Sequence, residues 1–166
     1  MKDLPQILLV DDSRQDLDLV QEACADAGLA AIFHLARDGQ EALTTVTRLA
    51  LQGVDLDLVV LDLAMPGKDG FRVLQHLQSK ERLKTVPVLV LTGSDDMRHV
   101  DRAFRLGADF YLYKPAVYDD YRVVAQRIAE LLEATPKPTR PGPTLEEREE
   151  LLWSLHSPNK WAGLGG

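Results

Sequence analysis

The chain has 166 residues, of which 45% are hydrophobic and 27% charged, the composition of a globular domain large enough to bury a core without disulfides. Its formal net charge of −7 argues against a nucleic-acid partner, because such binding needs a basic surface, and its single cysteine, Cys24, excludes an intrachain disulfide or a cysteine-based metal cage. No apolar run approaches the roughly 18 residues that span a membrane, and the first residues lack a signal-peptide pattern, so we expect a cytoplasmic protein without membrane contact.

Four short runs of consecutive apolar residues predict strands that are covered on both faces, as in a parallel sheet. These runs are Ile7–Val10, Leu58–Leu61, Val86–Leu91 and Phe110–Tyr113. A fifth, weaker strand is expected at Ala31–Ala36, with Phe33 and Leu35 on one face and Ile32 and His34 on the other.

The segments between these strands carry apolar residues at spacings of three and four, which predicts helices. In the first helix we expect Ser13 to form a capping box with Asp16 and Gly28 to end the helix. Similar patterns follow around residues 40–51, 71–77, 100–104 and 121–132. Five alternations of strand and helix predict an α/β fold with a parallel sheet of five strands and five helices.

The chain is predicted to divide into a domain at residues 1–134, a proline-rich linker at 135–143 and a C-terminal extension at 144–166. The linker, TPKPTRPGP, favours a semi-rigid polyproline II conformation. The extension contains a short helical pattern, LEEREELLWSLH, that would be marginal alone and is expected to dock on its own domain, dock on another chain, or fray. We expect it to be too short for a DNA-binding module.

Polar side chains follow four of the predicted strands. Asp11 and Asp12 follow the first, Asp62 the third, Thr92 the fourth and Lys114 the fifth. Because the carboxyl ends of parallel strands meet at one edge of the sheet, where such folds bind ligands, we expect these side chains to converge.

The charges of these side chains indicate a metal site. Three carboxylates in one cleft must take up protons or a cation, and Lys114 offsets only one of them. Oxygen ligands without histidine or cysteine favour Mg²⁺ over zinc. A carboxylate beside such a metal can act as a nucleophile toward phosphorus, and Asp62, at the end of the central strand, is the natural candidate.

Four sequence blocks occur in order: VDDS at 10–13, LDLAMPGKDG at 61–70, LTGS at 91–94 and YLYKP at 111–115. Together they resemble the response-regulator receiver domain of two-component signalling over about residues 5–134. The resemblance implies a flavodoxin-like, doubly wound α/β fold, in which a five-stranded parallel sheet has the order 2-1-3-4-5. The resemblance implies that Asp62 accepts a phosphoryl group from a sensor histidine kinase. It implies that magnesium is bound by Asp11, Asp12, Asp62 and the backbone carbonyl of Ala64. It also implies a switch formed by Thr92 and Tyr111, and a phosphoryl contact from Lys114.

Three longer stretches are similar to single-domain receivers that partner phytochrome-type photoreceptor kinases. They are LVDDSRQDLDLVQEA at 9–23, ARDGQEAL at 36–43 and SKERLKTVPVLVLTGS at 79–94. The similarity implies a phytochrome-type partner kinase, a homodimer, and signalling through protein–protein contact.

Two positions that tune phosphoryl loss in this family carry the small residues Ala64 and Ser94, which leaves the phosphoryl lifetime open. We expect a signalling phosphoacceptor rather than an enzyme. One alternative is a magnesium-dependent aspartyl-phosphate phosphatase, but Ala64 stands where such enzymes carry a second aspartate. The other is a scaffold that works without phosphorylation, which the intact set of polar residues disfavours. The four histidines have no ligand spacing, and we expect no function for them.

Overall fold

The computed structural model describes residues 3–80 and 83–134. Its centre is a five-stranded parallel sheet whose strand order, β2-β1-β3-β4-β5, confirms the predicted topology. The strands are β1 (Gln6–Val10), β2 (Ile32–Ala36), β3 (Leu58–Leu61), β4 (Val88–Thr92) and β5 (Phe110–Tyr113). The predicted linker and extension lie outside the described residues.

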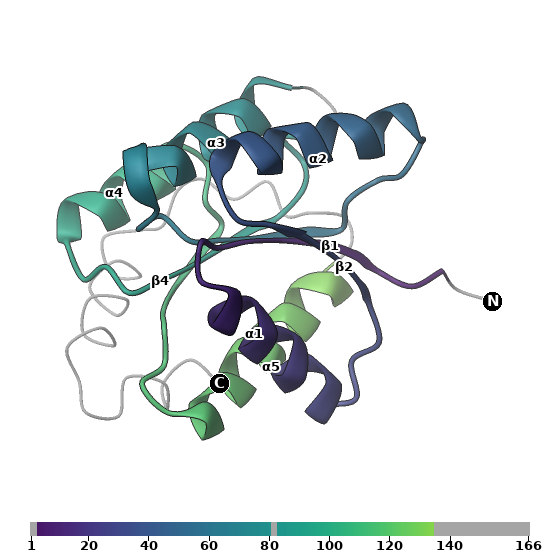
Figure 1. Ribbon diagram of the computed structural model, residues 1–166, viewed down its shortest axis with the longest axis vertical. Helices are drawn as coiled ribbons and strands as arrows, with labels where there is room; N and C mark the ends of the chain where they lie inside the picture. The colour runs from purple at the N-terminus through teal and green to yellow at the C-terminus, as the bar shows by residue number, and fades with distance from the viewer. Residues whose placement is uncertain (1–2, 81–82, 135–166) are drawn as a thin grey trace.

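Five helices cover the sheet in two layers, so that α1 and α5 lie on one face and α2, α3 and α4 on the other (Figure 1). They are α1 (Arg14–Asp26), α2 (Gly39–Leu51), α3 (Asp69–Ser79), α4 (Met97–Arg105) and α5 (Tyr121–Glu133). Two short 3₁₀ helices, η1 (Pro66–Lys68) and η2 (Tyr118–Asp120), precede α3 and α5. Within the described part of the chain, no helix combines the length and apolar character needed to cross a membrane.

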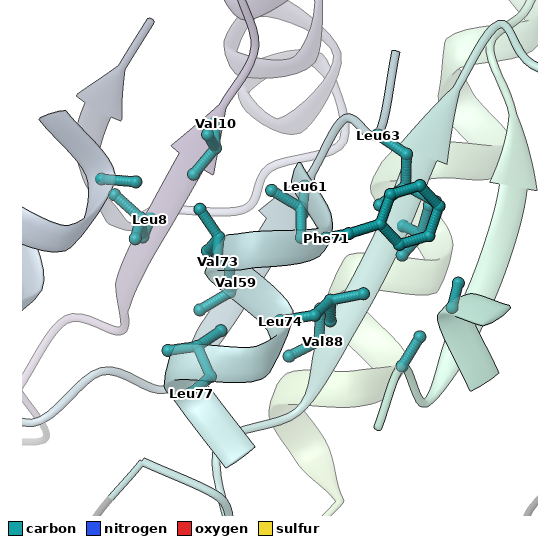
Figure 2. Packing of buried hydrophobic residues seen from close by; sticks show 14 of the residues in the cluster. Leu8, Val10, Val59, Leu61, Leu63, Phe71, Val73, Leu74, Leu77 and Val88 are labelled. Carbon is teal, nitrogen blue, oxygen red and sulfur yellow. The ribbon is translucent and has the colours of Figure 1, made fainter. Parts of the chain in front are cut away.

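The core has two parts because successive strand residues point to opposite faces. Leu8 and Val10 of β1 join the cluster under α2, α3 and α4, while Ile7 and Leu9 join the cluster under α1 and α5. Figure 2 shows the first cluster, in which Val73, Leu74 and Leu77 of α3 lie near strand residues that include Val59, Leu61 and Val88. Burial on both faces explains why these strands are apolar at consecutive positions.

Two strands differ from the sequence-based expectation. β4 begins at Val88 rather than Val86, because Pro87 has no N–H to donate to a neighbouring strand, and it ends at Thr92. β2 is one residue shorter than predicted, and neither of its faces is fully buried: Phe33 and His34 are half-buried, and Ile32 and Leu35 are exposed. β2 lies at the sheet edge, where one side has no neighbouring strand and both faces are only partly covered.

The start of α1 also differs in part. Ser13 caps the helix, since its Oγ accepts a hydrogen bond from the Asp16 N–H at 3.2 Å. The predicted return bond from Asp16 is replaced, because the Ser13 N–H donates to Asp11 Oδ1. The Asp16 carboxylate is therefore available to another part of the molecule.

Candidate functional site

Backbone hydrogen bonds fix the residues that follow the strands at the carboxyl edge of the sheet. The Asp11 N–H donates to the Ala36 carbonyl at 3.0 Å, and the Asp62 N–H donates to the Val10 carbonyl at 2.9 Å. On the other side of the sheet, the Lys114 N–H donates to Thr92 O at 2.8 Å. These bonds continue the hydrogen-bonding pattern of the sheet by one residue beyond the strands. They fix the backbone positions from which the polar side chains project.

Three aspartates meet at this edge. Asp11, Asp12 and Asp62 each offer a carboxylate oxygen, and these oxygens lie within 4.8 Å of one another. Asp11 and Asp62 are buried, with 6% and 2% of their surface exposed, whereas Asp12 is open to solvent. Oxygen donors with one open side are the ligand set that a small divalent cation takes while keeping several of its waters.

Lys114 is the cation that the described structure places among these acids. Its Nζ lies 2.7 Å from Asp11 Oδ2, 3.0 Å from Asp62 Oδ2 and 2.7 Å from Asp16 Oδ2. Asp16 comes from the first turn of α1, which Ser13 caps. One ammonium group thus faces several carboxylates, and the site keeps an excess of negative charge.

Each buried carboxylate is held through both of its oxygens. Oδ1 of Asp11 accepts the Ser13 N–H, and Oδ1 of Asp62 accepts the Ala64 N–H, both at 2.9 Å. The Oδ2 atoms of both aspartates contact Lys114. Gly70 of α3 packs closely beside Asp62, because a Cβ there would lie 2.6 Å from the Asp62 carbonyl oxygen.

The pKa values of Asp11 and Lys114 are both raised in this site, for different reasons. Burial raises the pKa of Asp11 from 3.8 to about 6, against the opposing effects of Lys114 and Ser13. Burial alone would lower the pKa of Lys114, but hydrogen bonds to Asp11 and Asp16 and the charge of Asp62 raise it above its usual range. Three carboxylates that share one lysine leave negative charge that a divalent ion would offset, so the donor set fits such an ion.

A second set of polar groups lies at the end of β4. Thr92 is completely buried, and its Oγ1 accepts the Ser94 N–H at 3.3 Å. Tyr111, 1% exposed, donates its hydroxyl to the Ser94 carbonyl at 2.8 Å. Burial, followed by the charge of Asp62, raises the pKa of Tyr111 well above its usual range, so its hydroxyl stays a donor.

The structure therefore brings Asp11, Asp12, Asp62 and Lys114 together and places Thr92 and Tyr111 beside one loop. Ala64 contributes its N–H to Asp62, while its carbonyl as a metal ligand stays a prediction. Sequence reasoning missed the contact of Asp16 with Lys114. No local pattern in the sequence could have found it, because the two residues lie 98 positions apart.

Comparison with known proteins agrees with this geometry. Residues 7–128 match the response regulator receiver domain, and the chain belongs to this family. It is 36% identical over 136 residues to the DNA-binding dual master transcriptional regulator RpaA of Synechocystis sp. (strain ATCC 27184 / PCC 6803 / Kazusa), a match that covers 81% of the chain. The chain spans about half of the length of that relative, 52%.

Two solved structures are similar over most of the chain. The phosphorylated cyanobacterial phytochrome response regulator RcpA aligns with a TM-score of 0.70 and 29% identity, covering 86% of this chain and 100% of RcpA. The Mn²⁺-bound response regulator Rcp1 aligns with a TM-score of 0.66 and 31% identity, covering 84% and 99%. The chain thus has the receiver fold of two-component signalling proteins, and its structural neighbours include a phytochrome response regulator.

Proposed function

We propose that this chain is a response regulator that accepts a phosphoryl group on Asp62 from a phosphohistidine of a sensor histidine kinase, in a Mg²⁺-dependent reaction. One observation carries the proposal: the buried Asp62 has one oxygen on a backbone N–H and the other on Lys114, beside two further carboxylates. This arrangement has a nucleophile, a cation for phosphoryl oxygens and ligands for a metal in one place.

In the proposed reaction, a carboxylate oxygen of Asp62 forms a bond to phosphorus while the phosphorus–nitrogen bond of the phosphohistidine breaks. The histidine nitrogen keeps the bonding electrons and takes up a proton. The Ala64 N–H holds the other Asp62 oxygen, which orients the attacking one. Lys114, already 3.0 Å from Asp62 Oδ2, is within easy reach of a phosphoryl oxygen formed there.

Mg²⁺ would be held by Asp11, Asp12, Asp62 and the carbonyl of Ala64. When bound, it would offset the negative charge that a phosphoryl group adds to this acidic edge. The existence of a Mn²⁺-bound form of the similar response regulator Rcp1 supports the binding of a divalent ion by this chain.

The proposed signal is a change in the set of groups at the end of β4. Thr92 Oγ1 now accepts the Ser94 N–H, and in the phosphorylated state it would turn to the phosphoryl group. Tyr111 and the β4–α4 loop would follow, which alters the surface offered to a partner. The chain would then act through protein–protein contact.

We propose that the chain catalyses only its own phosphorylation and dephosphorylation. The rival interpretation as a phosphatase lacks support, since the residue two positions after Asp62 is the small Ala64, which has no acid or base to offer. The phosphorylation-independent scaffold is also disfavoured, because it gives no reason for a costly cluster of buried carboxylates.

Partner and assembly are part of the proposal. A phytochrome-type kinase is supported by the similarity to RcpA, which is a phytochrome response regulator. We further propose that residues 1–134 form the receiver domain, 135–143 a linker and 144–166 an extension that supports a homodimer.

The test is to treat the chain with phosphoramidate and Mg²⁺ and to record its intact mass. Wild type should gain one phosphoryl group, and the Asp62→Asn variant should gain none. Asp119→Asn, at an exposed acid before α5, is the matched control and should behave as wild type. If wild type gains no phosphoryl group, or if Asp62→Asn still gains one, the proposal is wrong. The mass of the native assembly, measured on the same samples, tests the homodimer.

A further inference from the structure

The β4–α4 loop is tied down at one residue, Ser94. Its N–H donates to Thr92 Oγ1 at 3.3 Å, and its carbonyl accepts the Tyr111 hydroxyl at 2.8 Å. Its own hydroxyl shares a hydrogen bond of 2.8 Å with Nδ1 of His99 and accepts a longer one, 3.4 Å, from the Asp96 N–H. Ser94 therefore connects both residues of the proposed switch to α4.

His99 is itself held in place by packing. It lies half-buried in the first turns of α4, and its ring meets the ring of Phe71 edge-on, with centroids 5.6 Å apart at 67°. Phe71 belongs to α3 and is 3% exposed, and the Arg102 guanidinium lies 4.2 Å from the centroid of its ring. The imidazole is thus fixed between two helices, and its Nδ1 presents a fixed partner to the loop.

We propose that His99 is a positioning residue that holds Ser94, and with it the β4–α4 loop, in the arrangement in which Tyr111 is buried. The inference rests on the proposed function and adds a residue that regulates it. Turning Thr92 Oγ1 toward a phosphoryl group removes the acceptor of the Ser94 N–H. The loop can follow only as Ser94 leaves its other partners, so the bond to His99 opposes the change.

Removing this bond should shift the loop toward the conformation that accepts phosphoryl groups. In His99→Ala, we expect phosphoramidate with Mg²⁺ to phosphorylate the chain about fivefold faster, since one hydrogen bond has a net effect of about that size. Without any phosphodonor, hydrogen exchange of the backbone amides at 93–96 should rise by a similar factor.

The hydrogen bond can be separated from packing by two further variants. His99→Asn places an amide where Nδ1 lies along the side chain and should restore slow exchange and slow phosphorylation. His99→Gln carries its amide one bond further out and should behave as His99→Ala does. Arg105→Ala, at an exposed residue of the same helix that contacts the Asp101 carbonyl, is the control and should leave both measurements unchanged.

The proposal also requires that the effects of Ser94→Ala and His99→Ala are not additive, because both remove the same bond. Amide exchange unchanged in His99→Ala, or Asn and Gln variants that behave alike, would overturn it. Failure of the proposed function has a different signature, since wild type would then take up no phosphoryl group while the exchange data would still decide the role of His99.

Discussion

At the carboxyl edge of the sheet, the acids that follow β1 and β3 are on a first side held by charge, whereas the residues around the end of β4 are on a second side held by hydrogen bonds. We call the first side the acidic half: Asp11, Asp12, Asp16 and Asp62 with Lys114. We call the second side the hydroxyl half: Thr92, Ser94 and Tyr111 with His99. The two halves meet at β3 and β4, which are adjacent strands of the same sheet.

The difference indicates that the two halves suit different functions. Buried charges that are only partly balanced respond strongly when a cation or an anion arrives, so the acidic half suits binding and chemistry. Single neutral hydrogen bonds each contribute only about 1 kcal/mol, so the hydroxyl half can rearrange at small cost. A rearrangement there could be driven by the stronger contacts made in the acidic half.

The largest effect should come from Lys114→Met. Removing the ammonium leaves Asp11 and Asp62 buried without their cation, and breaking a buried ion pair in this way costs about 3–5 kcal/mol. We expect urea unfolding at pH 7 with a metal chelator to show a loss of about 3 kcal/mol. Added Mg²⁺ should recover part of it. Lys80→Met, at an exposed lysine, should change stability by less than about 0.5 kcal/mol, and a similar loss there would show that the acidic half is not held by charge.

A change of opposite sign is expected for Asp11→Asn. The folded-state pKa of Asp11, about 6, lies above the value of 3.8 for a free carboxyl group, so the metal-free chain binds a proton more tightly when folded. Stability therefore falls as pH rises from 3.8 through about 6, by up to about 3 kcal/mol from this group. Asparagine does not ionise, so the variant does not lose stability in this way and should be about 2 kcal/mol more stable than wild type at pH 7.

The pH series provides the control for this prediction. At pH 4 the Asp11 carboxyl group of the folded wild type is protonated and uncharged, like the amide that replaces it, so wild type and Asp11→Asn should unfold at nearly the same urea concentration. With Mg²⁺ at pH 7, the stability advantage of Asp11→Asn over wild type should shrink or change sign, because the variant has lost a metal ligand. An advantage for the variant that does not depend on pH would exclude burial of charge as its cause.

The fold could be predicted from the sequence because its signals are local. Consecutive apolar residues in strands and spacings of three and four in helices predicted the alternation of strands and helices that the structure has, and the resemblance to receiver domains predicted the strand order. The convergence of Asp11, Asp62 and Lys114 also followed, since parallel strands put their carboxyl ends at one edge. The exposure of Ile32 and Leu35 in β2 was harder to predict, because it depends on the position of this strand at the sheet edge.

Contacts between side chains were harder to predict. Asp16 was assigned to a capping box, but its carboxylate contacts Lys114, which is 98 positions away in the sequence. His99 was expected to have no function, because no spacing in the chain links it to a ligand set. Its contact with Ser94 depends on how the β4–α4 loop folds back onto α4. Periodicity does not carry that information.

The smallest effect tests the hydroxyl half through Tyr111→Phe. The variant keeps the buried ring and removes only the donor to the Ser94 carbonyl, so the loss of stability should be about 1 kcal/mol or less. Because Ser94 is then held by one partner fewer, amide exchange at 93–96 should rise, as it should in His99→Ala. If amide exchange rises in both variants, the loop is held by several weak hydrogen bonds at Ser94 acting together. A loss of several kcal/mol, like that expected for Lys114→Met, would instead show that both halves are equally rigid and that the loop is not a switch.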